Sequence, residues 1–265
     1  MTLRLTGINI YPIKSCRGIP LSEWDTDAFG LRFDRRWMVV DETGTFITQR
    51  THPRMALIEV KVGDDALQID APGMPTLETP LRPSAAVVTQ VVVWNFAGRS
   101  TWLGEGPALW FTEFLETACS LVHMGDEVVR YANPLFAPEA TRVSFADGYP
   151  LLLISEESLA DLNRRLSRPV PMNRFRPNLV LAGAEAYAED AWKKIEIGGM
   201  PLRVVKPCLR CAITTTDQVT TERGREPLRT LATYRRVNGE VMFGQNVVHE
   251  TTGRLRVGDT VQPLA

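Results

Sequence analysis

The most informative stretch of the sequence is KPCLRCAITTTD, at residues 206–217. It contains two of the four cysteines, Cys208 and Cys211, with basic side chains at Lys206 and Arg210. Nearby cations favour a thiolate over a thiol, and the thiolate is the form that attacks electrophiles or binds a soft metal. This stretch is therefore the first candidate for chemistry.

Three interpretations of the C-x-x-C pair are open from these residues. A thioredoxin-type dithiol usually opens a helix, whereas here Pro207 precedes the pair and the β-branched residues 213–216 predict a strand after it. A structural zinc site needs four ligands. The third interpretation is a single thiolate on a loop between strands, bound to a transition metal that a cofactor carries. The further ligands that a zinc site would need are scattered along the sequence, at Cys16, Cys119, His52, His123 and His249.

Length and charge limit the class of protein. A chain of 265 residues predicts one large domain or two closely packed domains. The 30 basic and 31 acidic residues nearly cancel, so nothing indicates binding to nucleic acid or to a membrane surface. No apolar stretch is long enough for a membrane span or a signal peptide. We expect a soluble, cytoplasmic protein with reduced cysteines and small-molecule or protein partners.

The hydrophobic pattern predicts a mainly β protein with a few helices, an α+β class built from β-barrel-like modules. Strands are predicted at residues 3–11, 36–41, 55–62, 67–69, 87–94, 151–154, 178–182, 193–197, 202–206, 241–248 and 255–263. Helices are predicted at residues 107–117, after Ser155, and at residues 227–236. Residues 125–148 lack periodicity and predict a long ordered loop, a kind of segment that often carries function.

Three short basic segments could bind an anion. Residues 11–18 place Lys14 and Ser15 where a strand ends before a glycine, which suits a phosphate. Residues 34–37 add two arginines, and residues 173–178 add two more beside two carboxamides. Taken singly, each of these basic residues is better explained as a solvated surface charge.

Several segments together resemble a known family. They are residues 11–18, 30–37, 175–178, 187–192, 208–217, 225–228, 234–235 and 243–245, which span nearly the whole chain in the family's order. The sequence resembles the MOSC (molybdenum cofactor sulfurase C-terminal) proteins that carry an N-terminal β-barrel domain. This group includes the mitochondrial amidoxime reducing component and bacterial proteins that detoxify N-hydroxylated bases. The resemblance implies an N-terminal β-barrel domain at residues 1–122, packed on a MOSC β-barrel domain at residues 123–265.

The resemblance also implies a molybdenum cofactor, Mo-molybdopterin, and a set of residues that hold it. Cys211 matches the family's molybdenum ligand and catalytic position, and a further thiolate suits a soft metal. The positions implied to bind the cofactor's phosphate and pterin are Lys14, Ser15, Arg35, Arg176, Asn178 and Arg210. Cys208 has a simpler explanation as a small buried residue beside the site. Asp147 and Gln245 are possible pocket residues, although Asp147 could cap a turn and Gln245 could be a strand side chain.

The activity that the resemblance implies is the two-electron reduction of an N–O bond in amidoximes, hydroxylamines and N-hydroxylated bases. No cysteine follows Cys211, so we expect no appended iron–sulfur domain. Electrons are expected from a separate ferredoxin-like, cytochrome b5-like or flavin reductase protein, with the chain acting as a monomer and without a membrane anchor. Two alternatives stay open, namely a cofactor carrier or sulfur-transfer protein using Cys211, and a dithiol protein without molybdenum.

Overall fold

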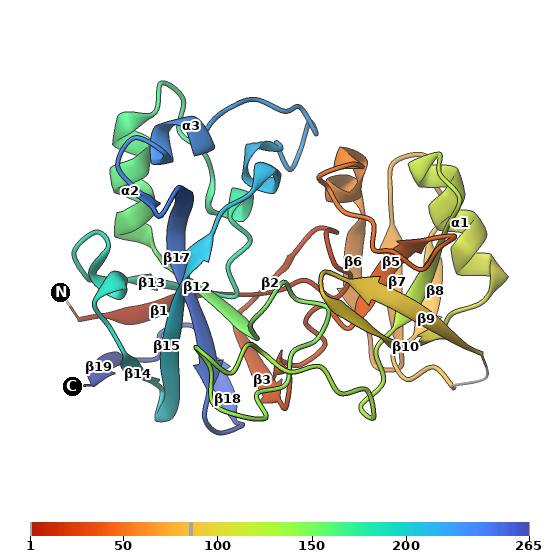
Figure 1. The fold of residues 1–265 in the computed structure, drawn as a ribbon, viewed down its shortest axis with the longest axis horizontal. Coiled ribbons are helices and arrows are strands. Elements are labelled where there is room, and N and C mark those ends of the chain that lie inside the picture. The colour runs from red at the N-terminus through yellow and green to blue at the C-terminus, as the bar shows by residue number, and fades with distance from the viewer. Residues whose placement is uncertain (1, 85–86, 265) are drawn as a thin grey trace.

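The computed structural model of the chain describes residues 2–84 and 87–264. Strands dominate this part of the chain, and they are accompanied by three short α-helices and several 3₁₀ turns. Figure 1 shows two halves side by side, one containing β1 and β12–β19 and the other containing β5–β11 and α1. The prediction of a mainly β protein with a few helices is confirmed.

The larger half is built on a nine-stranded sheet. Eight of the nine strands form its path, and the order is β19 (Val261–Leu264), β14 (Lys194–Ile197), β15 (Met200–Leu209), β17 (Glu240–His249), β12 (Leu151–Ser155), β13 (Leu179–Ala182), β1 (Arg4–Ile10) and β2 (Ile19–Leu21). The ninth strand, β16 (Arg236–Val237), pairs with β17 outside that path. The predicted strands at residues 3–11, 193–197, 202–206 and 241–248 all correspond to strands of this sheet.

The N-terminal segment of the chain is part of the larger half. β1 runs antiparallel to β13, with Leu5 opposite Leu181 and Ile8 opposite Leu179. A small sheet joins β18 (Arg254–Arg256), β3 (Glu23–Asp27) and β4 (Gly30–Leu31). Segments from both ends of the sequence are thus hydrogen-bonded to one another. The division at residue 122 stays a prediction.

The smaller half has two sheets and the longest helix of the described chain. One sheet has the order β5 (Trp37–Asp41), β11 (Cys119–His123), β10 (Phe96–Trp102) and β9 (Val88–Val93). The other is β6 (Glu59–Val62), β7 (Ala66–Asp70) and β8 (Leu77–Pro80). Helix α1 (Glu105–Leu115) buries Trp110, Phe111 and Phe114 in the core of this half. The prediction of a helix at residues 107–117 is confirmed with its start two residues earlier.

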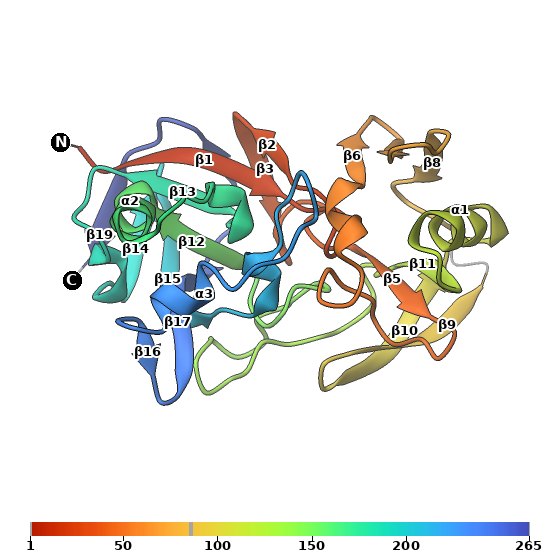
Figure 2. The same ribbon diagram turned by 90° about the horizontal axis from the view of Figure 1, so that it is seen from above.

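Two helices cover one face of the large sheet (Figure 2). Helix α2 (Glu156–Arg165) begins after Ser155, whose hydroxyl accepts a hydrogen bond from the amide of Ser158 at 3.1 Å, as an N-cap does. Helix α3 (Leu228–Leu231) is much shorter than the predicted residues 227–236. Two residues after its end, the hydroxyl of Thr233 donates to the carbonyl of Thr230 at 2.7 Å, a side-chain bond that competes with helix continuation.

The predicted strand at residues 213–216 is wrong, because a 3₁₀ helix spans Ala212–Thr215. Two threonine hydroxyls donate to carbonyls three residues earlier, Thr214 to Cys211 at 3.0 Å and Thr215 to Ala212 at 2.8 Å. These local bonds outweigh the strand preference of β-branched residues. The predicted strand at residues 255–263 is two strands, β18 and β19, since Gly258 adopts a positive φ of 100° between them.

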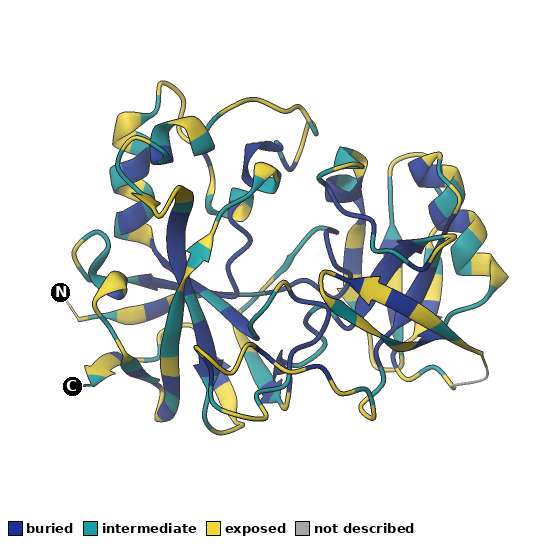
Figure 3. Cartoon of the chain, viewed as in Figure 1, coloured by how far each residue is buried: buried dark blue, intermediate teal, exposed yellow. Residues whose placement is uncertain are grey.

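Parts of the segments that join the two halves are buried (Figure 3). Every residue from 11 to 16 is buried, and so are residues 143–146 of the loop predicted at 125–148. That loop contains no helix or strand in the structure, which confirms the prediction. No helix within the described ranges is long and apolar enough to cross a membrane.

A pair of glycines tests the packing of the smaller half. Gly44 and Gly73 share a φ of +80°, but a Cβ on Gly44 would lie 2.3 Å from the carbonyl oxygen of Gln90, whereas a Cβ on Gly73 would meet nothing within 4 Å. Both alanine variants carry the same backbone strain, so the steric clash adds only to Gly44→Ala. We expect Gly44→Ala to lower the midpoint of thermal unfolding by roughly 5 °C more than Gly73→Ala. Equal midpoints in scanning calorimetry would contradict this packing.

Candidate functional site

A pocket lies where the two halves meet, and we call it the central pocket. Its cavity of about 120 Å³ is partly open to solvent. Its walls come from the buried segment after β1, the loop before β12, the loop before β13 and the end of β15. The residues predicted to bind a cofactor or metal all line it, namely Lys14, Ser15, Arg35, Arg176, Asn178, Arg210 and Cys211.

Three of these residues have a left-handed backbone. The φ angles are 69° at Ser15, 49° at Arg35 and 55° at Arg176. Non-glycine residues rarely adopt this region, and such strain concentrates at functional sites where the surrounding structure enforces it. Here the backbone amide of Arg35 is held by the carbonyl of Tyr11 at 2.9 Å. The turn at Arg35 therefore lies against the segment that leads to Ser15.

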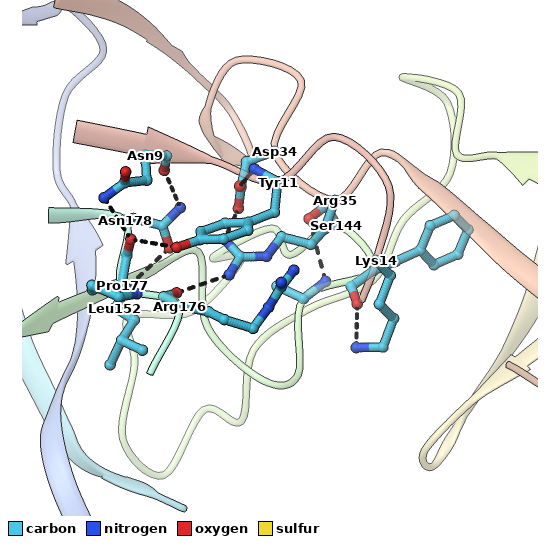
Figure 4. Close-up of polar contacts among 12 residues, drawn as sticks. Asn9, Tyr11, Lys14, Asp34, Arg35, Ser144, Leu152, Arg176, Pro177 and Asn178 are labelled. Carbon is cyan, nitrogen blue, oxygen red and sulfur yellow. Dashed lines mark hydrogen bonds and ion pairs between the residues drawn. The ribbon is translucent and has the colours of Figure 1, made fainter. Parts of the chain in front are cut away.

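The ring of Tyr11 organises two guanidinium groups. The Cζ atoms of Arg35 and Arg176 each lie 4.2 Å from its centroid, within cation–π distance. Figure 4 shows both arginines next to this ring. The Tyr11 hydroxyl donates to the carbonyl of Pro177 at 3.1 Å, and Gly18 leaves room for the ring, since a Cβ there would lie 2.4 Å from it. Tyr11 thus holds the two cations side by side.

Asn178 fixes the orientation of Arg35. Its Oδ1 accepts from Arg35 Nη1 at 3.0 Å and from the amide of Leu152 at 3.1 Å, while its Nδ2 donates to the carbonyl of Asn9 at 3.1 Å (Figure 4). Arg35 also forms an ion pair with the buried carboxylate of Asp34. One guanidinium is therefore fixed from two sides, and the amide of Asn178 is largely occupied by protein groups.

Arg176 is a buried cation that lacks a full set of partners. It is 9% exposed, and burial lowers its pKa to about 10. Its Nη2 atom has no hydrogen-bond partner among the described residues, and the same holds for Nη2 of Arg50 and Nε of Arg210. Unpaired buried polar groups are costly, so these nitrogens indicate that an anionic or strongly accepting ligand completes the pocket.

Lys14 is held by the loop that precedes β12. Its Nζ donates to the carbonyl of Phe145 at 2.8 Å and to Oδ1 of Asp147 at 2.5 Å. Burial lowers the pKa of Lys14, and the charge and hydrogen bond of Asp147 oppose that effect. Two of the three donors of the ammonium group are used by these contacts, which leaves a third for a ligand.

The two cysteines of the C-x-x-C pair have different cationic neighbours. Arg210 Nη1 lies 3.0 Å from the sulfur of Cys208, and its Nη2 donates to the carbonyl of Phe175 at 2.7 Å. Burial raises the pKa of Cys208 despite the opposing charge of Arg210. The sulfur of Cys211, where β15 passes into the 3₁₀ turn, lies 3.7 Å from Arg50 Nη1. Arg210 therefore contacts the other sulfur of the pair, not that of Cys211.

Arg50 is a pocket residue that sequence reasoning missed. It lies in the loop before the 3₁₀ helix at Pro53–Leu57, and its Cζ is 4.5 Å from the ring centroid of Trp94. No motif surrounds it in the sequence, and only folding brings it to Cys211. A second residue missed is Asn246, which lines the pocket from β17. Its neighbour Gln245 points elsewhere, donating to Asp190 at 2.7 Å.

The remaining cysteines and histidines lie outside the central pocket. Cys16 and Cys119 are buried, and burial raises their pKa values to about 12 and about 11. Within residues 2–84 and 87–264, no three His, Cys, Asp or Glu side chains gather closely enough to hold a metal ion by themselves. The four-ligand zinc site considered for the C-x-x-C pair has no such set in this part of the chain.

The fold and pocket define a two-domain β protein with a basic pocket and an accessible thiol between its halves. The MOSC N-terminal beta barrel domain matches residues 2–118, and the MOSC domain matches residues 140–262. The chain belongs to the family that joins these two domains, which includes the mitochondrial amidoxime-reducing components.

Three relatives illustrate the similarity. Mitochondrial amidoxime-reducing component 1 of Homo sapiens is 38% identical over 96% of this chain and 81% of its own length. The corresponding protein of Mus musculus is 39% identical over 96% of this chain and 80% of its own. Mitochondrial amidoxime reducing component 2 of Rattus norvegicus is 38% identical over 95% and 80%. The similarity therefore covers both halves of the structure.

The exposure of the four sulfurs predicts their reactivity. Cys208 and Cys211 are partly exposed, whereas Cys16 and Cys119 are buried. At neutral pH we expect iodoacetamide to label the first pair in the native, cofactor-free protein and all four in denaturant, because access of the reagent limits alkylation. Peptide mass spectrometry measures the labelling. Equal labelling of Cys16 and Cys211 in the native protein would contradict the structure.

Proposed function

We propose that this chain is a molybdenum-cofactor-dependent reductase of N-hydroxylated compounds. Two independent observations support the proposal. Relatives of 38% and 39% identity are named amidoxime-reducing components. The central pocket also combines buried cations that lack partners with a partly exposed thiol at Cys211. The unpartnered guanidinium nitrogens carry the argument from the structure.

The residues of the pocket fit the proposed cofactor, which has an anionic phosphate tail and a soft metal centre. Arginine forks suit phosphate oxygens, and Arg35 and Arg176 present two of them side by side. The third donor of Lys14 adds a further group for an anion, and Ser15 lines the pocket beside it. The sulfur of Cys211 is the soft ligand that a thiol-preferring metal requires. We therefore assign these residues to holding the cofactor.

The proposed reaction converts an amidoxime, two electrons and two protons into an amidine and water. The cofactor supplies the two-electron redox chemistry when it is bound. The chain binds and orients the reactants, and its buried pocket walls limit the access of water. Electrons would arrive from a separate carrier protein of the ferredoxin-like, cytochrome b5-like or flavin-reductase kind. The cytoplasm is the compartment that we propose.

Replacing each cysteine separately tests the role of Cys211. We expect Cys211→Ala to abolish benzamidoxime reduction with a chemical or surrogate electron donor, because it removes the proposed metal ligand. Cys208→Ala should retain much of the activity, since its sulfur contacts Arg210 instead. The measurement is turnover together with the molybdenum content of protein purified from a cofactor-competent host. Equal loss in both variants would indicate a dithiol mechanism. A Cys211→Ala variant that retains pterin and delivers active cofactor to another enzyme would indicate a carrier.

Replacing the arginines beside Tyr11 tests cofactor binding. We expect Arg35→Ala and Arg176→Ala to lower the pterin content of the purified protein several-fold, while turnover per bound molybdenum changes much less. Arg164→Ala is a matched control, because that arginine is exposed on α2 and pairs with Asp161. Pterin content is measured by fluorescence after oxidative release. A normal pterin content with low turnover would mean that these arginines contact substrate.

A further inference from the structure

Asp147 lies between two cavities. Together with Gly148 and Tyr149 it lines both the central pocket and a neighbouring cavity of about 560 Å³, which we call the side cavity. The two cavities therefore share one wall. A molecule in the side cavity could extend one end past Asp147 into the space that Cys211 lines.

The side cavity has a mixed wall, in which Asn95, Arg130 and Asn133 lie beside apolar and aromatic side chains. Phe96, Val129 and Tyr131 line it, with Pro134 from the same loop. Val129 is 51% exposed and Tyr131 is 57% exposed. Large apolar side chains lining a concave surface are typical of sites for hydrophobic or aromatic ligands. The long loop at residues 125–148 supplies most of this wall, so it forms the cavity.

The carboxylate of Asp147 is fixed in place but open to a ligand. Its Oδ1 accepts from Lys14 Nζ at 2.5 Å and from Trp94 Nε1 at 3.1 Å. Its backbone carbonyl accepts from Arg130 Nη2 at 3.0 Å. The side chain is nevertheless 62% exposed, and no hydrogen bond from the described chain reaches Oδ2. One carboxylate oxygen is thus held rigidly while the other remains available.

Asp147 also differs in charge from the rest of the central pocket. Among the described residues that line this pocket it carries the sole carboxylate, and the other charged side chains are Lys14, Arg35, Arg50, Arg176 and Arg210. Desolvation alone would raise the pKa of Asp147, but the charge of Lys14 and hydrogen bonds from Lys14 and Trp94 lower it. The ionised carboxylate acts as an acceptor at neutral pH, so its role is to bind N–H groups and not to donate a proton.

We propose that the side cavity binds the aromatic or aliphatic body of the substrate and that Asp147 holds its amidine nitrogen. This inference rests on the proposed function and specifies its substrate class as amidoximes with a hydrophobic substituent. The NH₂ group of an amidoxime donates to Oδ2 of Asp147. The product amidine is protonated at neutral pH and makes a stronger, charge-assisted contact. In this arrangement the N–O group of the amidoxime is directed toward the central pocket, which Cys211 lines.

Binding of benzamidine and of neutral benzamide tests the proposal without any turnover. The two ligands have nearly the same shape, but only benzamidine is a cation. In isothermal titration calorimetry we expect the wild type to bind benzamidine at least about tenfold more tightly than benzamide, from one charge-assisted contact. Asp147→Asn should bring that ratio close to one. Tyr131→Ala should weaken both ligands by a similar factor, because Tyr131 contributes the apolar wall.

Asp126→Asn is the matched control. Asp126 is also a carboxylate bonded to a buried cation, Arg36 at 2.7 Å, but it is 91% exposed and lines neither cavity. We expect this variant to keep the wild-type ratio. Because binding is measured directly, a protein that lacks reductase activity can still pass or fail this test.

Two results would overturn the proposal. The first is an Asp147→Asn variant that keeps the wild-type preference for benzamidine. The second is an Asp147→Asn variant that loses pterin while its benzamidine-to-benzamide ratio stays unchanged, since Asp147 would then contact the N–H edge of the cofactor. Pterin content is measured on the same samples, so the substrate contact and the cofactor contact are distinguished in one experiment.

Discussion

The site depends on holding several positive charges together in a buried place. Burial of a cation costs free energy unless charge or hydrogen bonds compensate for it. Asp34 compensates Arg35, the ring of Tyr11 lies against both Arg35 and Arg176, and a carbonyl and Asp147 hold Lys14. The compensation is incomplete at Arg176, whose Nη2 has no partner within the described chain. An anionic ligand would supply what is missing, which links the stability of the pocket to its proposed occupant.

This cluster exists because distant parts of the chain meet. The segment after β1 carries Tyr11 and Lys14, and β1 itself pairs with β13, which follows Asn178 directly. The pairing therefore sets the position of Arg176 relative to Tyr11. Ser15 and Arg176 have left-handed backbones within a few residues of these strands, and Arg35 has one just before β5. The rigid sheet thus fixes the loops, and the loops carry the functional side chains.

Much of the site was predictable because each motif follows or precedes a strand. Lys14, Arg35 and Arg176 belong to short segments with several informative residues, so their convergence could be inferred from a resemblance. Arg50 lies in a loop without a motif, and its approach to Cys211 depends on how the smaller half packs. The contact of Arg210 with Cys208 could not be inferred either, because side-chain direction near a β-bulge is set by tertiary packing. The same limit explains residues 213–216, where threonine hydroxyl bonds outweigh strand propensity.

Lys14 connects the two functions that we assign to the pocket. Burial lowers its pKa, and the carboxylate of Asp147 counteracts this effect. A cationic ligand bound to Asp147 therefore lowers the pKa of Lys14 further, because it offsets the negative charge of the carboxylate. An anion bound near Lys14 raises that pKa. The proposed substrate and cofactor contacts would then be coupled through one ion pair of 2.5 Å. A cofactor phosphate on the free donor of Lys14 would leave Asp147 less strongly bound to that lysine, and so a better acceptor for an amidine.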